Sequence, residues 1–184
     1  MIWIKLVSDF SELVGIKTLQ DENLKKNLSI TEAEKEGFVT AEYSIEFLQK
    51  LHLKNPSIIA KDGNQIVGYA LVALKSIRDQ HELLADLFDS IDKVQYKGQM
   101  LKNTNYVVIG QLCVSKKYRG LGLVQAMYQH FKTTLSGEFD YCLTDIASNN
   151  PRSLKAHTKN GFVVVDTLNY GGLSWDIVLW DWNA

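Results

Sequence analysis

The chain has 184 residues, with 20 basic and 21 acidic side chains and a formal net charge of -1. This length suits one domain with a sizeable core. Because the chain has no long basic run, we expect no nucleic-acid partner. No apolar run approaches the length of a membrane-spanning helix, so we expect no membrane partner either. The first apolar run is too short for a signal peptide, which predicts a cytoplasmic protein.

The two cysteines, Cys113 and Cys142, lie in apolar, strand-like runs. Their spacing matches no metal or redox motif. We therefore interpret both as reduced core residues, with a catalytic thiol as the alternative, and we expect no bound metal.

The first part of the chain alternates strand-like and helical patterns. Ser44 can cap a helix because its hydroxyl can accept a hydrogen bond from a first-turn N–H, and Asn55-Pro56 would end that helix. The expected elements are a strand at Trp3–Val7, a helix with spacing at Phe10, Leu13, Val14 and Ile16-Lys17, a helix beginning at Thr31 and ending at Gly37, and the helix after Ser44.

A β-hairpin is predicted next, because Asp62-Gly63 separates two apolar runs, Ile58–Ala60 and Ile66–Val72. Residues 77–105 then interrupt the strand pattern. Helical spacing within them predicts an amphipathic helix through the apolar residues Leu84, Leu87, Phe88, Ile91 and Val94.

The second part of the chain contains a strand, a helix with one apolar face, and a second strand and helix. Asn150-Pro151 is typical of a helix start, and Asn160-Gly161 of a helix end. The expected elements are strands at Tyr106–Val114 and Tyr141–Ile146, a helix from Leu123 to Leu135, the helix after Asn150, and a terminal strand pair at Phe162–Val165 and Trp175–Trp182 with a turn at Tyr170-Gly171-Gly172. The pattern predicts an α/β chain with a mixed sheet.

The segment Val114–Gly122 lies between a predicted strand and a predicted helix. The first turn of a helix offers unpaired N–H groups and the positive end of the helix dipole to a diphosphate. Gly120 and Gly122 let the backbone approach closely, and Arg119 adds a positive charge. A Rossmann loop is disfavoured because Gln125 replaces its third glycine, and the Walker ending is absent. An ordinary helix start is the alternative.

Two linked motifs resemble the GNAT superfamily of N-acetyltransferases. Leu112–Gly122 is similar to its acetyl-CoA signature, and Asn150–Phe162 is similar to its second motif. The resemblance implies one domain over residues 1–184. Its fold would be α/β, with a mixed, mostly antiparallel central sheet, splayed middle strands and flanking helices. Residues 77–105 would be a helical insertion between two strands.

The resemblance also implies the residues that bind acetyl-CoA. Val124 departs from the family pattern, which usually has glycine or alanine there. Backbone groups of Leu112 and Val114 would bond the pantetheine arm and polarise the thioester carbonyl. The implied cofactor-binding residues are Leu112, Cys113, Val114, Arg119, Gly120, Leu121, Gly122, Leu123, Val124, Asn150 and Ser153.

His157 stands where the family commonly has tyrosine, and we hypothesise that it is the general acid for the departing thiolate. A packed or surface histidine is the alternative. Arg152, Lys155 and Lys159 form a basic stripe that suits a solvated helix face, or else the ribose phosphate of CoA. The general base is open: the candidates are Asp145, Glu36, Glu42 and water.

The predicted function is transfer of an acetyl group from acetyl-CoA to a primary amine of a small molecule or peptide by direct attack. One alternative is a CoA-binding or sensing module without transfer activity. Another is an acetyltransferase acting on a protein N-terminus or lysine. The aromatic residues Trp175, Trp180 and Trp182 would pack the sheet or contribute to a homodimer surface.

Overall fold

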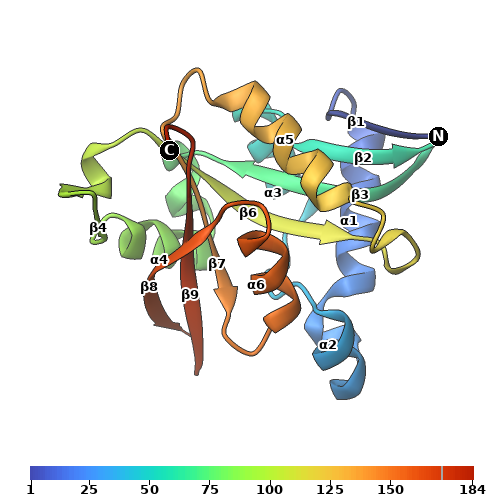
Figure 1. The fold of residues 1–184 in the computed structure, drawn as a ribbon. Helices are drawn as coiled ribbons and strands as arrows, with labels where there is room; N and C mark the ends of the chain where they lie inside the picture. Colours follow the sequence, from blue (N-terminus) through green and yellow to red (C-terminus); the bar gives the residue numbers. More distant parts are fainter. Residues whose placement is uncertain (171) are drawn as a thin grey trace. The chain divides into compact units, whose positions relative to one another are not determined.

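The computed structural model describes residues 1–170 and 172–184, and Figure 1 follows its elements along the chain. The chain divides into two compact units. Unit 1 comprises Met1–Val72 and Gly110–Thr134, and unit 2 comprises Ala73–Ile109 and Leu135–Ala184. The single domain expected from the sequence stays a prediction.

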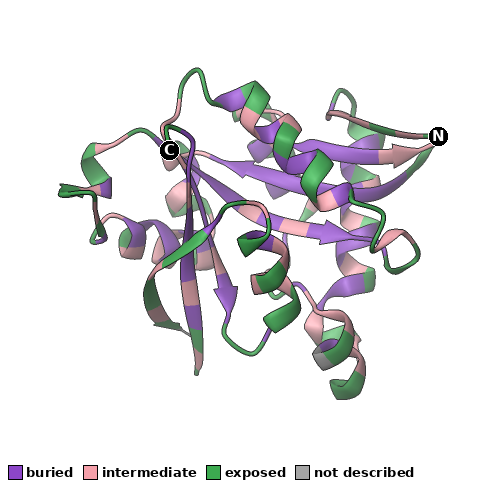
Figure 2. Cartoon of the chain, viewed as in Figure 1, coloured by how far each residue is buried: buried purple, intermediate pink, exposed green. Residues whose placement is uncertain are grey.

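In unit 1 the strand order is β1-β2-β3-β6, and β2 pairs antiparallel with both β1 and β3. Figure 2 shows that β3 is buried along most of its length. The elements are β1 (Ile2–Leu6), α1 (Phe10–Asn23), α2 (Ile30–Glu36), α3 (Ile45–Lys54), β2 (Ile58–Asp62), β3 (Gln65–Ala73), the last part of β6 (Tyr106–Val114) and α5 (Leu123–Leu135), with short 3-10 helices at Lys25–Asn27 and Lys116–Tyr118.

The predicted helix ends and hairpin of unit 1 are largely confirmed. The Ser44 hydroxyl accepts from the Phe47 N–H at the start of α3. Helix α2 begins earlier than predicted, because Ser29 rather than Thr31 is its cap and accepts from the Glu32 N–H. The hairpin turn holds Gly63 at a φ of 57°, a left-handed conformation that favours glycine.

Helix α1 buries a different face from the one expected. Leu13 and Ile16 are buried, but Phe10 and Val14 are exposed. The carboxylate of Glu12 is instead buried and takes hydrogen bonds from the ammonium groups of Lys5 and Lys61 at 2.7 and 2.9 Å. A carboxylate on the inner face therefore takes a position that the apolar spacing alone did not predict.

In unit 2 the strand order is β6-β7-β9-β8, with β6 parallel to β7 and the other pairs antiparallel. The predicted mixed, mostly antiparallel sheet with flanking helices is confirmed. The elements are a 3-10 helix at Lys75–Gln80, α4 (Glu82–Ile91), β4 (Gln95–Tyr96), β5 (Gln99–Met100), a 3-10 helix at Leu101–Asn103, the first part of β6, β7 (Tyr141–Ala147), α6 (Pro151–Thr158), β8 (Val163–Tyr170) and β9 (Leu173–Asp181).

Residues 77–105 contain the predicted amphipathic helix as α4, whose apolar face is buried. They also contain an unpredicted hairpin, β4–β5. Its turn places Lys97 at a φ of 47° and Gly98 at 81°. Lysine is an unusual residue for a left-handed position, so Lys97-Gly98 lacks the Asn-Gly or Asp-Gly signal on which hairpin prediction relies.

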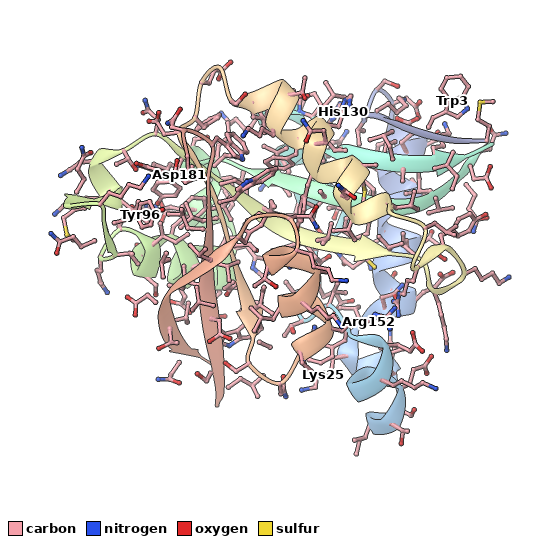
Figure 3. The ribbon with its side chains drawn as sticks, viewed as in Figure 1. Trp3, Lys25, Tyr96, His130, Arg152 and Asp181 are labelled. Carbon is pink, nitrogen blue, oxygen red and sulfur yellow. The ribbon has the colours of Figure 1, made fainter. Side chains whose placement is uncertain are left out.

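Contacts of charged and aromatic side chains hold residues 77–105 in place at two points within unit 2. At one end, the Arg78 guanidinium and the Tyr106 hydroxyl both donate to the Asp92 carboxylate, each at 2.7 Å. At the other, the Lys97 ammonium bonds the buried Asp181 carboxylate at 2.6 Å. Figure 3 labels Tyr96 and Asp181 at this second anchor. The segment is therefore a packed cover rather than a loose loop.

The terminal strands are longer than predicted. Trp175 and Trp182 are buried, as expected for core packing. Of the predicted turn at Tyr170-Gly171-Gly172, Gly171 lies outside the described residues. Within residues 1–170 and 172–184, no helix has the length and apolar content needed to cross a bilayer.

We expect Glu12→Gln to destabilise the fold by about 2–4 kcal/mol in urea denaturation at pH 7, because two lysines would lose a buried partner. Burial alone raises the pKa of Glu12, but hydrogen bonds from Lys5, the Ser8 N–H and Lys61 lower it to about 2. The Glu12 carboxylate thus contributes to the free energy of unfolding above its ordinary pKa of 4.5, and this contribution is lost as pH falls towards 2.

The control is Glu42→Gln, the same change in an exposed ion pair with Lys26. That substitution should cost no more than about 1 kcal/mol. Equal effects of the two substitutions would contradict a special role for the buried carboxylate.

Candidate functional site

The start of α5 in unit 1 presents unpaired backbone donors. The N–H of Ala126 donates to the Gly122 carbonyl at 3.0 Å, which closes the first helical turn. The N–H groups of Leu123, Val124 and Gln125 find no acceptor among the described residues. Three unpaired donors at the positive end of a thirteen-residue helix form a favourable site for an anion.

Both loop glycines have left-handed backbone, with φ of 82° at Gly120 and 77° at Gly122. A Cβ placed on either residue would meet nothing within 4 Å. The left-handed backbone, rather than steric crowding within the protein, therefore requires glycine at both positions. The open space beside them leaves room for a ligand.

The apolar residues of the loop differ in exposure. Leu121 is 62 % exposed, whereas Leu123 is buried. Val124, which departs from the family pattern, is half-buried on the first turn of α5. Only part of its side chain therefore reaches solvent at the helix start.

The side chain of Arg119 contacts the protein rather than open solvent, and only 14 % of it is exposed. Its Nε–H donates to the Val114 carbonyl at 3.0 Å. Nη1 donates to the Glu36 carbonyl at 2.7 Å and contacts the Glu36 carboxylate at 3.2 Å, and Nη2 donates to Asn23 Oδ1 at 2.7 Å. Most of its donors are thus engaged, so its charge is neutralised locally.

Strand β6 leads into this loop. Leu112 is half-buried and Cys113 is buried. Burial raises the pKa of the Cys113 thiol to about 12, although the charge of Arg119 and a hydrogen bond with Tyr69 act in the opposite direction. Both cysteines are free and buried, as predicted. A thiol with so high a pKa is a poor nucleophile at neutral pH.

A buried amide network lies beside the same strand and was not predicted. Gln111 Oε1 accepts from the Tyr69 hydroxyl at 2.7 Å and from Gln20 Nε2 at 3.0 Å, while Gln111 Nε2 donates to the Ala41 carbonyl at 2.7 Å. The Tyr43 hydroxyl donates to the backbone of β6 at 3.0 Å. Gln111 is the one amide in an otherwise apolar strand sequence, which is the signal that could have indicated it.

In unit 2, α6 brings three predicted residues together. The Asn150 side chain caps the helix by accepting from the Ser153 N–H at 3.2 Å. The Ser153 carbonyl in turn lies 2.8 Å from His157 Nδ1. The predicted cap and shared helix face are therefore confirmed, and whether these residues contact a cofactor stays a prediction.

His157 is 3 % exposed and lies edge-on to the Phe162 ring, with centroids 5.2 Å apart. Burial lowers its pKa to about 4, although the hydrogen bond with Ser153 favours the charged form. The ring is therefore neutral at pH 7, and the Nδ1–H donates to the Ser153 carbonyl. The basic residues of α6, Arg152, Lys155 and Lys159, are exposed, as a solvated face requires.

Asp145 differs from the other base candidates. Glu36 pairs with Arg119, and Glu42 pairs with Lys26. Asp145 is half-buried on β7, opposite Ile177 of β9, and forms no ion pair within the described part of the chain. Burial raises the pKa of its carboxyl to about 7. This value suits a proton acceptor that works near neutral pH.

Asp145 also lies beyond the end of the β6–β7 ladder. Parallel pairs join Tyr106–Val108 to Tyr141–Leu143, whereas β7 continues to Ala147 along β9. At the next position the Thr144 hydroxyl donates to the Ile109 carbonyl at 2.8 Å. The Thr144 side-chain bond thus follows the last backbone pair between β6 and β7, and Asp145 is the next residue along β7.

Comparison with solved structures gives the same fold as the one described above, a mixed, mostly antiparallel sheet with flanking helices. The NatC complex bound to Gag peptide and CoA has a chain with 16% identity and a TM-score of 0.66, and the alignment covers 98% of each chain. The ribosomal-protein-S18-alanine N-acetyltransferase of Escherichia coli is 10% identical, with a TM-score of 0.66 and coverage of 98% and 94%. A GNAT-family acetyltransferase of Streptococcus agalactiae is 17% identical, with a TM-score of 0.69 and coverage of 100% and 96%.

None of the curated proteins that were compared matches the sequence. Residues 24–162, however, match the acetyltransferase (GNAT) family, and this range includes the loop Val114–Gly122, β7 and α6. The chain therefore belongs to the acetyltransferase (GNAT) family.

Proposed function

We propose that this protein transfers an acetyl group from acetyl-CoA to a primary amine by direct attack. The observation that carries the proposal is the start of α5, where left-handed Gly120 and Gly122 lead into three N–H groups that have no acceptor in the described part of the chain. A diphosphate provides the charge and the acceptor oxygens that these donors lack among the described residues. The loop therefore fits the pyrophosphate of CoA through its backbone donors, while the Arg119 guanidinium is engaged within unit 1.

Acetyl-CoA supplies an acetyl group activated as a thioester. The amine nitrogen forms a bond to the acetyl carbon, the carbon–sulfur bond breaks, and the amine loses a proton. We assign that proton to the Asp145 carboxylate, whose pKa is about 7. A carboxyl with this pKa can take up the proton and release it again, so it can return a proton to the departing sulfur.

The sequence-based hypothesis of His157 as general acid stays a prediction, and the pKa of about 4 argues against it. At pH 7 the imidazole is neutral, and the neutral ring commits its Nδ1–H to Ser153. We propose instead that His157 holds α6 in place.

The proposed activity is tested by measuring free-thiol release from acetyl-CoA against polyamines, amino acids, aminoglycosides and short peptides. Acceptor-dependent release with one class would support the proposal and identify the acceptor. CoA binding without release would favour a sensing module, and release only with peptides would favour a protein-modifying enzyme. Failure to bind CoA would overturn the assignment of the loop.

Asp145→Asn should lower kcat/KM at pH 8 by about 100-fold or more, because the amine loses its proton acceptor. In the unchanged protein kcat/KM should fall as pH drops below 7, since the carboxyl becomes protonated. Asp166→Asn is the matched control, an exposed carboxyl on β8 that also pairs with Ile177. A pH profile unaffected by Asp145→Asn would contradict the role.

The same substitution should stabilise the protein at pH 8 by about 1–3 kcal/mol. The folded pKa of Asp145 lies above its ordinary value of 3.8, so stability is lost as pH rises from about 4 towards 7. Above pH 7 the full cost of the buried charge is present, and asparagine removes it. Urea denaturation at pH 5 and pH 8 measures the difference.

Gly122→Val should weaken CoA binding by about tenfold or more in calorimetry, because its Cβ enters the open space before the helix start. Gly63→Val is the control. It imposes a similar backbone strain at a φ of 57°, also with nothing near its Cβ, in a hairpin turn. Equal CoA affinities of the two variants would place the anion elsewhere.

His157→Gln should retain most turnover at pH 7, since a neutral imidazole is not the proton source. Because the folded pKa of His157 is below 6.5, stability is full above pH 6.5 and falls by about 3 kcal/mol as pH drops to 4. The variant should lose this pH dependence, whereas His130→Gln should retain it. Collapse of turnover in His157→Gln with native-like stability would restore the general-acid hypothesis.

A further inference from the structure

The Arg119 guanidinium joins three separate parts of unit 1. It reaches the end of β6 at the Val114 carbonyl, the last residue of α2 at Glu36, and the last residue of α1 at Asn23. Asn23 is itself buried and donates to the Leu19 carbonyl at 2.8 Å, so its amide is fixed in place. A cation at two helix C-termini is favoured because the carbonyl ends carry partial negative charge.

Residues 37–43, directly after Glu36, have little regular structure of their own. Backbone bonds attach them to α1 and the turn after it, from the Val39 N–H to the Asn23 carbonyl at 3.0 Å and from the Lys25 N–H to the Val39 carbonyl at 2.9 Å. The Tyr43 N–H donates to Gln20 Oε1 at 2.9 Å. The conformation of the segment thus depends on neighbours that include both residues bonded by Arg119 Nη1 and Nη2.

We infer that Arg119 is a positioning residue that couples the loop Val114–Gly122 to residues 36–43. The inference rests on the proposed function, in which the loop after Arg119 binds CoA, and it adds that residues 36–43 position the amine acceptor. Ordering the loop fixes the guanidinium, and the guanidinium fixes Asn23 and Glu36. Because thermodynamic coupling is reciprocal, an ordered segment 36–43 also favours an ordered loop.

The geometry distinguishes this positioning role from simple attraction of a phosphate group by a positive charge. The guanidinium is planar and offers five N–H donors in a fixed fork, which is how one side chain reaches β6, α1 and α2. The ammonium of a lysine carries the same charge but cannot reproduce the fork. Arg119→Lys therefore retains the charge and removes the coupling.

The experiment compares Arg119→Lys, Arg119→Gln and Lys117→Gln. Lys117 is exposed on the same loop, so its substitution controls for loss of positive charge. Hydrogen exchange of residues 36–43 is measured with and without CoA. Calorimetry gives the dissociation constant for CoA, and steady-state kinetics gives separate KM and kcat values for the amine acceptor.

We expect both Arg119 variants to raise hydrogen exchange of Val39 and Tyr43 about 5- to 100-fold in the unliganded protein, and to abolish added protection by CoA. The KM for the acceptor should rise about tenfold while kcat changes less. Lys117→Gln should leave the exchange of the segment unchanged. The lysine variant should resemble the glutamine variant, because the fork rather than the charge is required.

A lysine variant with normal exchange and normal acceptor KM, beside a glutamine variant with weak CoA binding, would overturn the inference and make Arg119 a phosphate ligand. If either variant is unfolded by circular dichroism, Asn23→Ala removes one acceptor of the fork and should raise the exchange of Val39 in the same way. Unaltered exchange there overturns the inference too.

Failure of the proposed function is distinguishable from failure of this inference. If the unchanged protein does not bind CoA, the function fails and the coupling to the loop fails with it. The positioning of residues 36–43 is still decided by exchange in the unliganded variants. If CoA binds but does not protect residues 36–43, the assignment of the loop to CoA stands and the coupling is overturned.

Discussion

The site depends on helix α5, whose first three N–H groups find no acceptor within residues 1–170 and 172–184. Gly120 and Gly122 take left-handed conformations that bring the chain sharply from β6 into α5. Leu123 then turns its side chain into the core, which fixes the direction of the helix. The donors are held by backbone geometry, so they need no reorganisation when an anion arrives.

Much of the architecture could be predicted from the sequence because local signals and tertiary structure agree. The caps at Ser44 and Asn150 use their own side chains, and β6 has the bounds that its apolar run indicates. The burial of Glu12, however, depends on lysines from two other elements. No local periodicity contains that information, so the buried face of α1 differs from the one that its apolar spacing predicts.

The chemical roles were less accessible to sequence reasoning. A motif identifies Arg119 and His157, but their chemistry is set by partners distant in the chain: Asn23 and Glu36 for the guanidinium, and a buried aromatic environment for the imidazole. Asp145 stood out only weakly in the sequence. Its importance comes from the contrast with Glu36 and Glu42, which have cations beside them.

The cover formed by residues 77–105 has a consequence for dynamics. The hairpin β4–β5 has the ionic anchor between Lys97 and Asp181, whereas α4 combines the ionic contacts of Arg78 with a buried apolar face. Ionic contacts of partly exposed groups weaken with salt, while apolar packing does not. The hairpin β4–β5, with its ionic anchor at Lys97, is therefore suited to open as a separate low-stability unit before α4 does. Ionic strength would then control how often this part of the chain exposes itself to a protease.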